Sequence, residues 1–216
     1  MLGIQGRNKK YHSYKGDNGL TKTNLLLIKT IEEKTNKTIY VRNFKTTAPN
    51  KIWTTDVSEF KIAAGKVYLS AVLDLFDSSI VAFDVSRHPN LDQTKRMLKR
   101  AFSKENNLEG LIFHSDQGWQ YQNPFYISEL KKRGIQQSFS RKGNCMDNSI
   151  MENFFGIMKN EMFYGHEKEF KTIDELIKAI KKYIYYYNNK RINLKRKGLS
   201  PLVYRQQSYM SLQLSN

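Results

Sequence analysis

Three acidic residues in the middle of the chain have the types and the spacing of a metal-binding site. Asp56 lies within the β-like stretch IWTTDVSEF, Asp116 follows a short apolar run, and thirty-five residues separate Asp116 from Glu152. Carboxylate oxygens are the ligands that hard divalent cations prefer, and a pair of such cations suits phosphodiester chemistry. The pattern therefore favours metal-dependent cutting and joining of nucleic acid strands.

Each of these acids also has a purely structural interpretation. Asp56 could be an exposed strand residue, although an acid inside an apolar stretch is unusual. Asp116 could begin a turn before Gly118, which is a common use of aspartate. Glu152 follows Ser149 by three positions, the spacing of a capping box at a helix start. Only their convergence on one site would separate the chemical from the structural interpretation.

Other polar residues nearby are interpreted as structural. Asp74, Asp77 and Asp84 look like strand-end and turn residues, and Asp147 looks like a helix cap. A serine and a histidine precede the second acid, but the sequence has no Gly-x-Ser-x-Gly elbow, so a hydrolase triad is disfavoured. His114 is interpreted as a strand residue or a support for the site.

The elements that must position the acids are predicted from residue patterns. Three runs rich in β-branched and aromatic residues, with turn residues between them, predict an antiparallel meander. Two further apolar runs alternate with helices, so the chain is predicted to be an α/β protein with a mixed five-stranded sheet flanked by helices. The strands are expected at 52–62, 66–76, 79–86, 111–116 and 135–140.

Helix start signals accompany four apolar stripes. Helices are expected at 90–106, 123–134, 148–164 and 172–187. Their signals are Asn90, the pair Asn123-Pro124, and the capping box from Thr172 to Glu175. A further short helix is expected at 23–40, and residues beyond 188 are expected to form a basic tail.

Charge points to a polyanionic partner. The chain has 216 residues, with 36 Lys+Arg against 20 Asp+Glu, a formal net charge of +16. Basic side chains bind nucleic acid by neutralising phosphates. One cysteine excludes an internal disulfide and a cysteine-rich zinc module, and no run reaches the roughly 20 apolar residues of a membrane span. A cytoplasmic, nucleoid-associated protein without membrane contact is expected.

Basic residues in two regions are candidates for DNA contact. Those in the loop before Glu152 would position the DNA backbone, and those near the C-terminus would contact phosphates without sequence preference. A solvated surface loop and a solvated tail are the alternatives. The candidates are Arg141, Lys142 and Asn144 in the loop, and Lys190, Arg191, Lys195, Arg196 and Lys197 near the C-terminus.

Long stretches of the chain resemble the catalytic subunit of transposases of insertion-sequence family three, within the retroviral-integrase superfamily. The similar text includes APNKIWTTDVSEF, HSDQGWQY and SFSRKGNCMDNSIMENFFGIMKNEM. The resemblance implies a ribonuclease H-like fold and two Mg²⁺ or Mn²⁺ ions. It also implies catalytic and metal-binding roles for Asp56, Asp116 and Glu152. Members of this family place a basic residue seven positions after the glutamate, which here is Lys159.

The resemblance also implies partners and an organisation. The substrate would be double-stranded DNA, both the element's terminal inverted repeats and a target, in a bacterial cell, bound by a homo-oligomer assembled on DNA. Residues 1–51 would be a basic arm or linker, 52–165 the integrase-type catalytic core, and 166–216 a C-terminal helix and basic tail. The alternatives are a non-catalytic DNA-binding remnant that regulates transposition, and a structure-specific nuclease or ribonuclease H.

Overall fold

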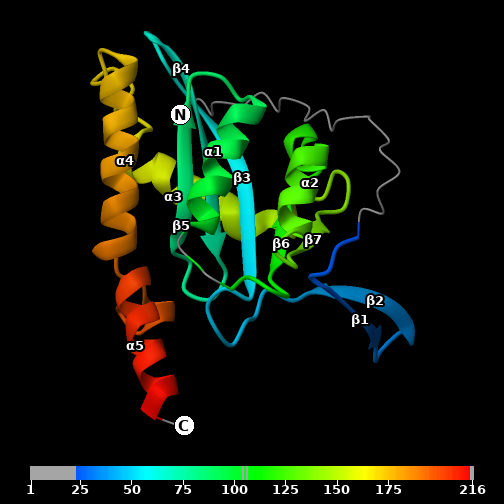
Figure 1. Cartoon of the computed structure of the whole chain (residues 1–216). Helices are drawn as coiled ribbons and strands as arrows, with labels where there is room; N and C mark the ends of the chain where they lie inside the picture. The colour runs from blue at the N-terminus through cyan, green and yellow to red at the C-terminus, as the bar shows by residue number, and fades with distance from the viewer. Residues whose placement is uncertain (1–22, 104, 106, 215–216) are drawn as a thin grey trace, which may run out of the picture.

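The apolar runs at the centre of the chain form a five-stranded mixed sheet, which confirms the predicted fold class (Figure 1). The computed structural model describes residues 23–103, 105 and 107–214. The strand order is β5-β4-β3-β6-β7, with β3, β4 and β5 antiparallel and β6 and β7 parallel to β3. The strands are β3 (Ile52–Ile62), β4 (Gly65–Asp74), β5 (Ile80–Ser86), β6 (Ile112–Ser115) and β7 (Gln136–Phe139).

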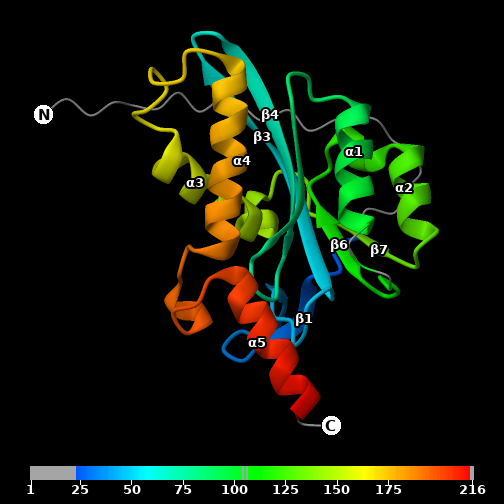
Figure 2. The same ribbon diagram turned by 60° about the vertical axis from the view of Figure 1, so that its left-hand side comes forward.

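Helices cover both faces of this sheet (Figure 2). On one face α1 and α2 enclose a buried cluster that includes Trp53 and Phe113, and on the other α3 and α4 enclose a cluster that includes Phe60, Phe154 and Leu176. None of the described helices has the length and apolarity needed to cross a membrane. The four helices are α1 (Leu91–Phe102), α2 (Pro124–Lys131), α3 (Ser149–Met162) and α4 (Ile173–Asn189).

The predicted helix starts are confirmed by side-chain caps at three helices. Asn90 accepts a hydrogen bond from the Gln93 backbone N–H at 3.0 Å, and Asn123 caps α2 in the same way. Thr172 and Glu175 form both halves of the capping box of α4. Three short 3₁₀ turns complete the core: η1 (Trp119–Gln122), η2 (Cys145–Asn148) and η3 (Leu194–Arg196).

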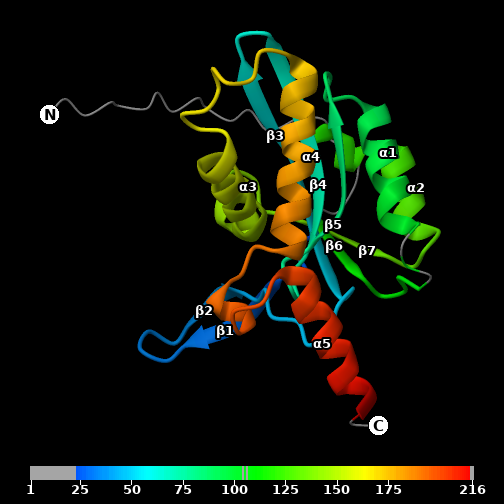
Figure 3. The same ribbon diagram turned by 90° about the vertical axis from the view of Figure 1, so that its left-hand side faces the viewer.

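The helix expected at 23–40 is wrong, because this segment forms a β-hairpin that projects from the core (Figure 3). Its strands are β1 (Leu27–Glu32) and β2 (Lys37–Arg42). The isoleucines, threonines and valine of these two strands are β-branched and suit an extended backbone. Asn36 takes a positive φ of 53° and its N–H donates to the Glu32 carbonyl at 2.8 Å, which closes the tight turn.

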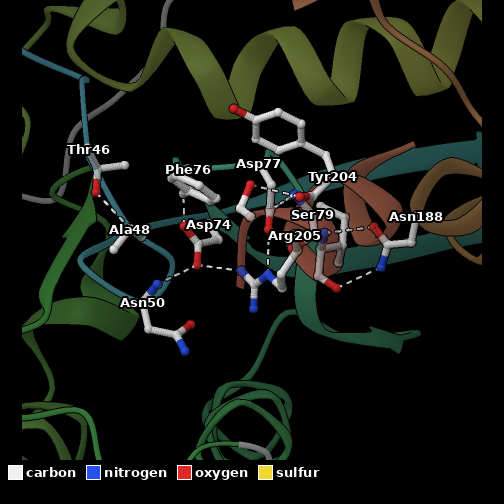
Figure 4. A network of polar contacts seen from close by, with 12 residues as sticks. Thr46, Ala48, Asn50, Asp74, Phe76, Asp77, Ser79, Asn188, Tyr204 and Arg205 are labelled. Atoms are coloured by element: carbon white, nitrogen blue, oxygen red, sulfur yellow. Dashed lines mark hydrogen bonds and ion pairs between the residues drawn. The ribbon is translucent and has the colours of Figure 1, made fainter. Parts of the chain in front are cut away.

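The C-terminal region contains a further helix, α5 (Pro201–Leu214), where a tail was expected. Proline at the first helical position suits this start. Arg205 fixes the helix to the end of β4: its guanidinium donates to Asp74 at 2.5 Å and also pairs with Asp77 (Figure 4). Both carboxylates are fully buried, and a buried carboxylate without a cation is strongly unfavourable. The arginine therefore holds α5 against the core.

Candidate active site

Two of the predicted acids become neighbours through the parallel pairing of β3 with β6. Thr55 lies opposite Ser115 in the register, so Asp56, within β3, lies beside Asp116, which directly follows the end of β6. The Asp56 carboxylate accepts a hydrogen bond from the Val57 N–H at 2.7 Å. The sheet therefore brings together two side chains that lie sixty positions apart in the chain.

The turn after β6 leaves little room for a side chain at Gly118 in the present positions of Asp116 and Gln120. The Asp116 carboxylate accepts a hydrogen bond from the Gly118 N–H at 2.9 Å, which orients the acid at the end of its strand. A Cβ added at Gly118 would lie 2.9 Å from that carboxylate oxygen and 2.7 Å from the Gln120 amide, closer than such atoms pack. The structural and the chemical interpretation of Asp116 are therefore compatible. One carboxylate oxygen can accept the hydrogen bond of the turn while the other is available to the cavity described below.

Asn148 attaches the start of α3 to the middle of β3, and this places Glu152. The Thr54 hydroxyl donates to the Asn148 side-chain oxygen, and the Asn148 amide donates to the Thr55 carbonyl at 3.3 Å. Glu152 lies one turn into α3. The capping-box interpretation of Glu152 is wrong, because α3 begins after Asn148 and has no side-chain cap.

The three acids line one cavity of about 620 Å³ together with the basic loop that precedes α3. Arg141, Lys142 and Asn144, the predicted DNA contacts of that loop, are among the residues that line the cavity. The remaining lining residues are Val57, Gln117, Ser140, Gly143, Cys145 and Asn148. The cavity thus combines acids from β3, the end of β6 and α3 with cations from one loop.

Electrostatics in the cavity oppose the accumulation of negative charge. Burial and the Asp116 charge, with a smaller effect of Glu152, raise the pKa of Asp56 to about 8, although the Val57 N–H and the charge of Lys159 act in the opposite direction. Partial burial also raises the pKa of Glu152. Such a group of carboxylates is stabilised by a cation. In the described part of the chain, no group of three or more acidic, histidine or cysteine side chains forms a ready metal cluster.

Lys159 lies on α3 beside the acids without lining the cavity. Its ammonium is 5.1 Å from the centre of the Phe60 ring and the side chain is half-buried. Burial lowers the pKa of Lys159, while the charges of Glu59 and Asp56 act to raise it. The residue is therefore near Asp56, as a helix face shared with Glu152 predicts.

The basic residues near the C-terminus lie away from the lining of the cavity. Lys190, Lys195 and Lys197 are exposed. Arg191 forms an ion pair with Glu161 at 2.6 Å, and Arg196 is buried. This region is thus more structured than a solvated tail, the alternative to phosphate contact, would be.

Two polar residues next to the cavity differ in outcome: the cap role of Asp147 is wrong, whereas His114 is a strand residue as expected. Asp147, expected to cap a helix, is instead a buried acceptor of hydrogen bonds from Arg141 and Arg42, because α3 starts one residue later. His114 is buried in β6 between the hydroxyls of Ser138 and Ser140, at 2.8 and 3.0 Å. No local pattern identifies Arg42, because it lies 105 positions before its partner.

Comparison with protein families finds two matching models, both described as integrase core domain. One matches residues 46–145 and the other residues 152–209. The first contains Asp56 and Asp116, and the second begins at Glu152. The two matches together include all three acids of the cavity.

Several curated bacterial proteins are similar to the chain. A Haemophilus influenzae protein named an uncharacterized transposase-like protein is 50% identical over 96% of this chain and 89% of its own length. The Escherichia coli protein that bears the name of transposase InsK of insertion sequence IS150 is 46% identical over 94% of this chain and 66% of its own length. Transposase InsF of insertion sequence IS3, also from E. coli, is 29% identical over 57% of this chain and 43% of its own length.

Among solved structures, the catalytic core domain of HTLV-2 integrase in complex with magnesium is similar in fold. The TM-score is 0.59 and the sequence identity 19%, over 74% of this chain and 99% of that one. At that identity the likeness concerns the arrangement of the sheet and its helices. It agrees with the predicted ribonuclease H-like fold.

Proposed function

Because the chain belongs to the integrase-core transposases of insertion-sequence family three, we propose that it cuts and joins DNA strands at the ends of an insertion sequence. The observation that carries this proposal is the convergence of Asp56, Asp116 and Glu152 on one cavity with a basic loop. Three elements distant in sequence supply these acids, which suits a shared chemical task. The reaction class is phosphoryl transfer between phosphodiesters.

The donor set of the cavity fits Mg²⁺ or Mn²⁺. Asp56, Asp116 and Glu152 would hold two such ions, since hard cations prefer carboxylate oxygens. The raised pKa of Asp56, caused by burial and by the Asp116 charge, indicates an acid that gains from a nearby cation. When bound, ions of this class activate an attacking oxygen and stabilise a leaving one. The magnesium complex of the HTLV-2 integrase core supports the same choice of cation.

The chain's own residues bind and orient the reactants. The carboxylates act as ligands and not as nucleophiles, so the DNA is never covalently attached to the protein. Arg141, Lys142 and Asn144 would hold the DNA backbone over the acids. Water would attack in line at the element end and release a 3′-hydroxyl, and that hydroxyl would then attack a second phosphodiester.

The partners follow from the same chemistry. The DNA would be double-stranded, and would comprise the terminal inverted repeats of the element and a target site. Lys159 and the exposed Lys190, Lys195 and Lys197 would add phosphate contacts. We also propose a homo-oligomer assembled on DNA, because two element ends must be joined to one target.

The non-catalytic remnant is the weaker hypothesis. A regulator that only occupies DNA has no need to gather three carboxylates in one cavity, and clustered like charges weaken DNA binding. A nuclease or ribonuclease H would keep the acids but would not join strands. The product formed from a pre-cut element end therefore separates these three functions.

The test is to incubate the protein with pre-cut element ends and supercoiled target DNA in the presence of Mn²⁺. The wild-type protein should give joined products. Glu152→Gln should abolish cleavage and joining while it leaves folding and end binding intact, since only a ligand charge is lost. Glu33→Gln, at an exposed turn position of the hairpin, makes the same charge change outside the cavity and should remain active.

Joining at the wild-type rate by Glu152→Gln would refute the assignment of this residue. Hydrolysis of the DNA without joining would favour the nuclease, and binding without any reaction would favour the remnant.

A further inference from the structure

Asp147 is a buried carboxylate that receives two arginines from different parts of the chain. Its side chain is fully buried. Arg141, in the same loop, donates from Nε and Nη2 to its two oxygens, each at 2.9 Å. Arg42, at the end of β2, donates from Nε at 2.7 Å. The N-terminal hairpin is therefore connected to the loop of the cavity through one carboxylate.

The two arginines are not equivalent. Arg141 lines the cavity with the three acids, and 42% of its side chain is exposed. Arg42 lies outside the lining residues and uses its Nη2 to hold the Asn144 side chain at 3.0 Å. Arg141 is consequently the arginine placed to meet a ligand in the cavity, whereas Arg42, 31% exposed, contacts the loop from outside the cavity lining.

A buried carboxylate needs one cation, and Asp147 has two. Removing the last cation from a buried ion pair leaves an uncompensated charge, which is strongly unfavourable. Arg42 alone supplies one cation to Asp147. Arg141 can therefore leave Asp147 without creating an unpaired buried charge. Asn24 and the Arg141 backbone N–H donate to the same carboxylate at 3.0 Å and lower the cost further.

We propose that Arg42 is a positioning residue that keeps Asp147 paired while Arg141 turns from it to a DNA phosphate in the cavity. This inference rests on the proposed function, because the phosphate belongs to the DNA. The inference also assigns a function to the N-terminal hairpin, because β2 ends at Arg42 and places this residue against the loop. Arg42 itself makes no phosphate contact in this arrangement.

The test uses the full chain and a duplex with the sequence of a pre-cut element end, with affinity measured over a range of NaCl concentrations. Each phosphate contact contributes about 0.9 to the slope of log affinity against log salt for duplex DNA. In Arg42→Ala, Arg141 must remain on Asp147, so the slope should fall by about 0.9 and binding should weaken about 10-fold at low salt. Thermal stability should change little, because Arg141 still pairs with Asp147.

Removing the carboxylate should restore binding. In the double variant Arg42→Ala with Asp147→Asn, no buried charge retains Arg141, so the wild-type slope should return. Arg141→Ala should lower the slope of log affinity against log salt by the same amount as Arg42→Ala. The variant with both changes should bind DNA no more weakly than either single variant. Lys29→Ala is the matched control, because Lys29 is an exposed cation on the same face of the hairpin.

The outcomes distinguish this inference from the proposed function. If the wild-type protein neither binds nor joins the end duplex, the proposed function fails. If it does both but the double variant stays as weak as Arg42→Ala, then Arg42 contacts DNA directly or acts only through folding, and the inference is overturned. An equal loss in Lys29→Ala would also overturn it, since general charge would then account for the effect.

Discussion

Replacing Asp56 by asparagine should stabilise the metal-free fold, although it removes a proposed ligand. Burial and the Asp116 charge raise the pKa of Asp56 from 3.8 to about 8. At about 1.36 kcal/mol per pKa unit, such a shift corresponds to an upper limit of about 6 kcal/mol. Asp56 forms part of a cavity wall that solvent reaches, which screens its charge, so we expect a gain of about 2 kcal/mol in the free energy of unfolding.

The upward shift of the Asp56 pKa determines how the stability difference between the two proteins depends on pH. The unfolded chain releases the Asp56 proton near pH 3.8, whereas the folded chain retains it until about pH 8. Between these values the unfolded state binds fewer protons, so the wild-type fold loses stability as pH rises. Asparagine has no such proton. The advantage of Asp56→Asn should therefore be absent near pH 4 and should be complete above pH 8.

Urea unfolding in the presence of EDTA, at pH values from about 5 to about 8, measures this difference. Glu33→Gln controls for the loss of one negative charge from a basic protein. Adding Mg²⁺ should reverse the trend for the wild-type protein, because cation binding stabilises the folded state and favours the ionised acids. Asp56→Asn should gain much less from Mg²⁺.

Parallel stability curves for the wild type and Asp56→Asn at every pH would refute the reasoning. They would mean that the carboxylate ionises in the folded protein at no cost, and the case for a cation-requiring cavity would lose its electrostatic support.

Two further predictions concern stability away from the cavity. Arg205→Ala should lower the free energy of unfolding by about 3 kcal/mol, because it leaves Asp74 and Asp77 buried without their cation. The control is Arg87→Ala, which removes an exposed ion pair. In the same urea assay it should lower the free energy of unfolding by at most about 0.5 kcal/mol. A loss for Arg205→Ala no larger than for Arg87→Ala would contradict this role. Thr172→Ala should cost about 1 kcal/mol through loss of the α4 cap, and an unchanged denaturation midpoint would show that the capping box contributes nothing.

Much of the fold was predictable because local signals and long-range packing agree. Runs of β-branched residues gave the strands of the sheet, and Asn90, Asn123 and Thr172 marked helix starts. By spacing alone the segment 23–40 favours a helix over the observed hairpin, because Leu26, Leu27 and Ile31 would share one helical face. Strand pairing and the positive φ of Asn36 decide between the two, and neither can be inferred from spacing.

The site was predictable only in part. Asp56 is conspicuous because an acid inside an apolar stretch is unusual, whereas Asp116 equally suits a turn until the parallel pairing of β3 with β6 brings the two acids together. The cap assignment of Asp147 is wrong, because the environment of this residue depends on Arg42, which comes from a separate hairpin. A residue whose role depends on a distant partner has no local pattern that would reveal it.

The orientation of Glu152 depends on packing and not on its own interactions. Met151, Phe154, Phe155 and Met158 are buried at the spacing of one helical face, and they fix the rotation of α3 on the sheet. Glu152 lies beside this face, so the apolar contacts hold the helix on the sheet while the Glu152 side chain lines the cavity. A single inserted residue before Phe154 would rotate Glu152 by roughly 100° relative to the buried stripe. The apolar face that stabilises α3 thus also sets the geometry of the site, whereas burial and the Asp116 charge oppose the ionisation of Asp56.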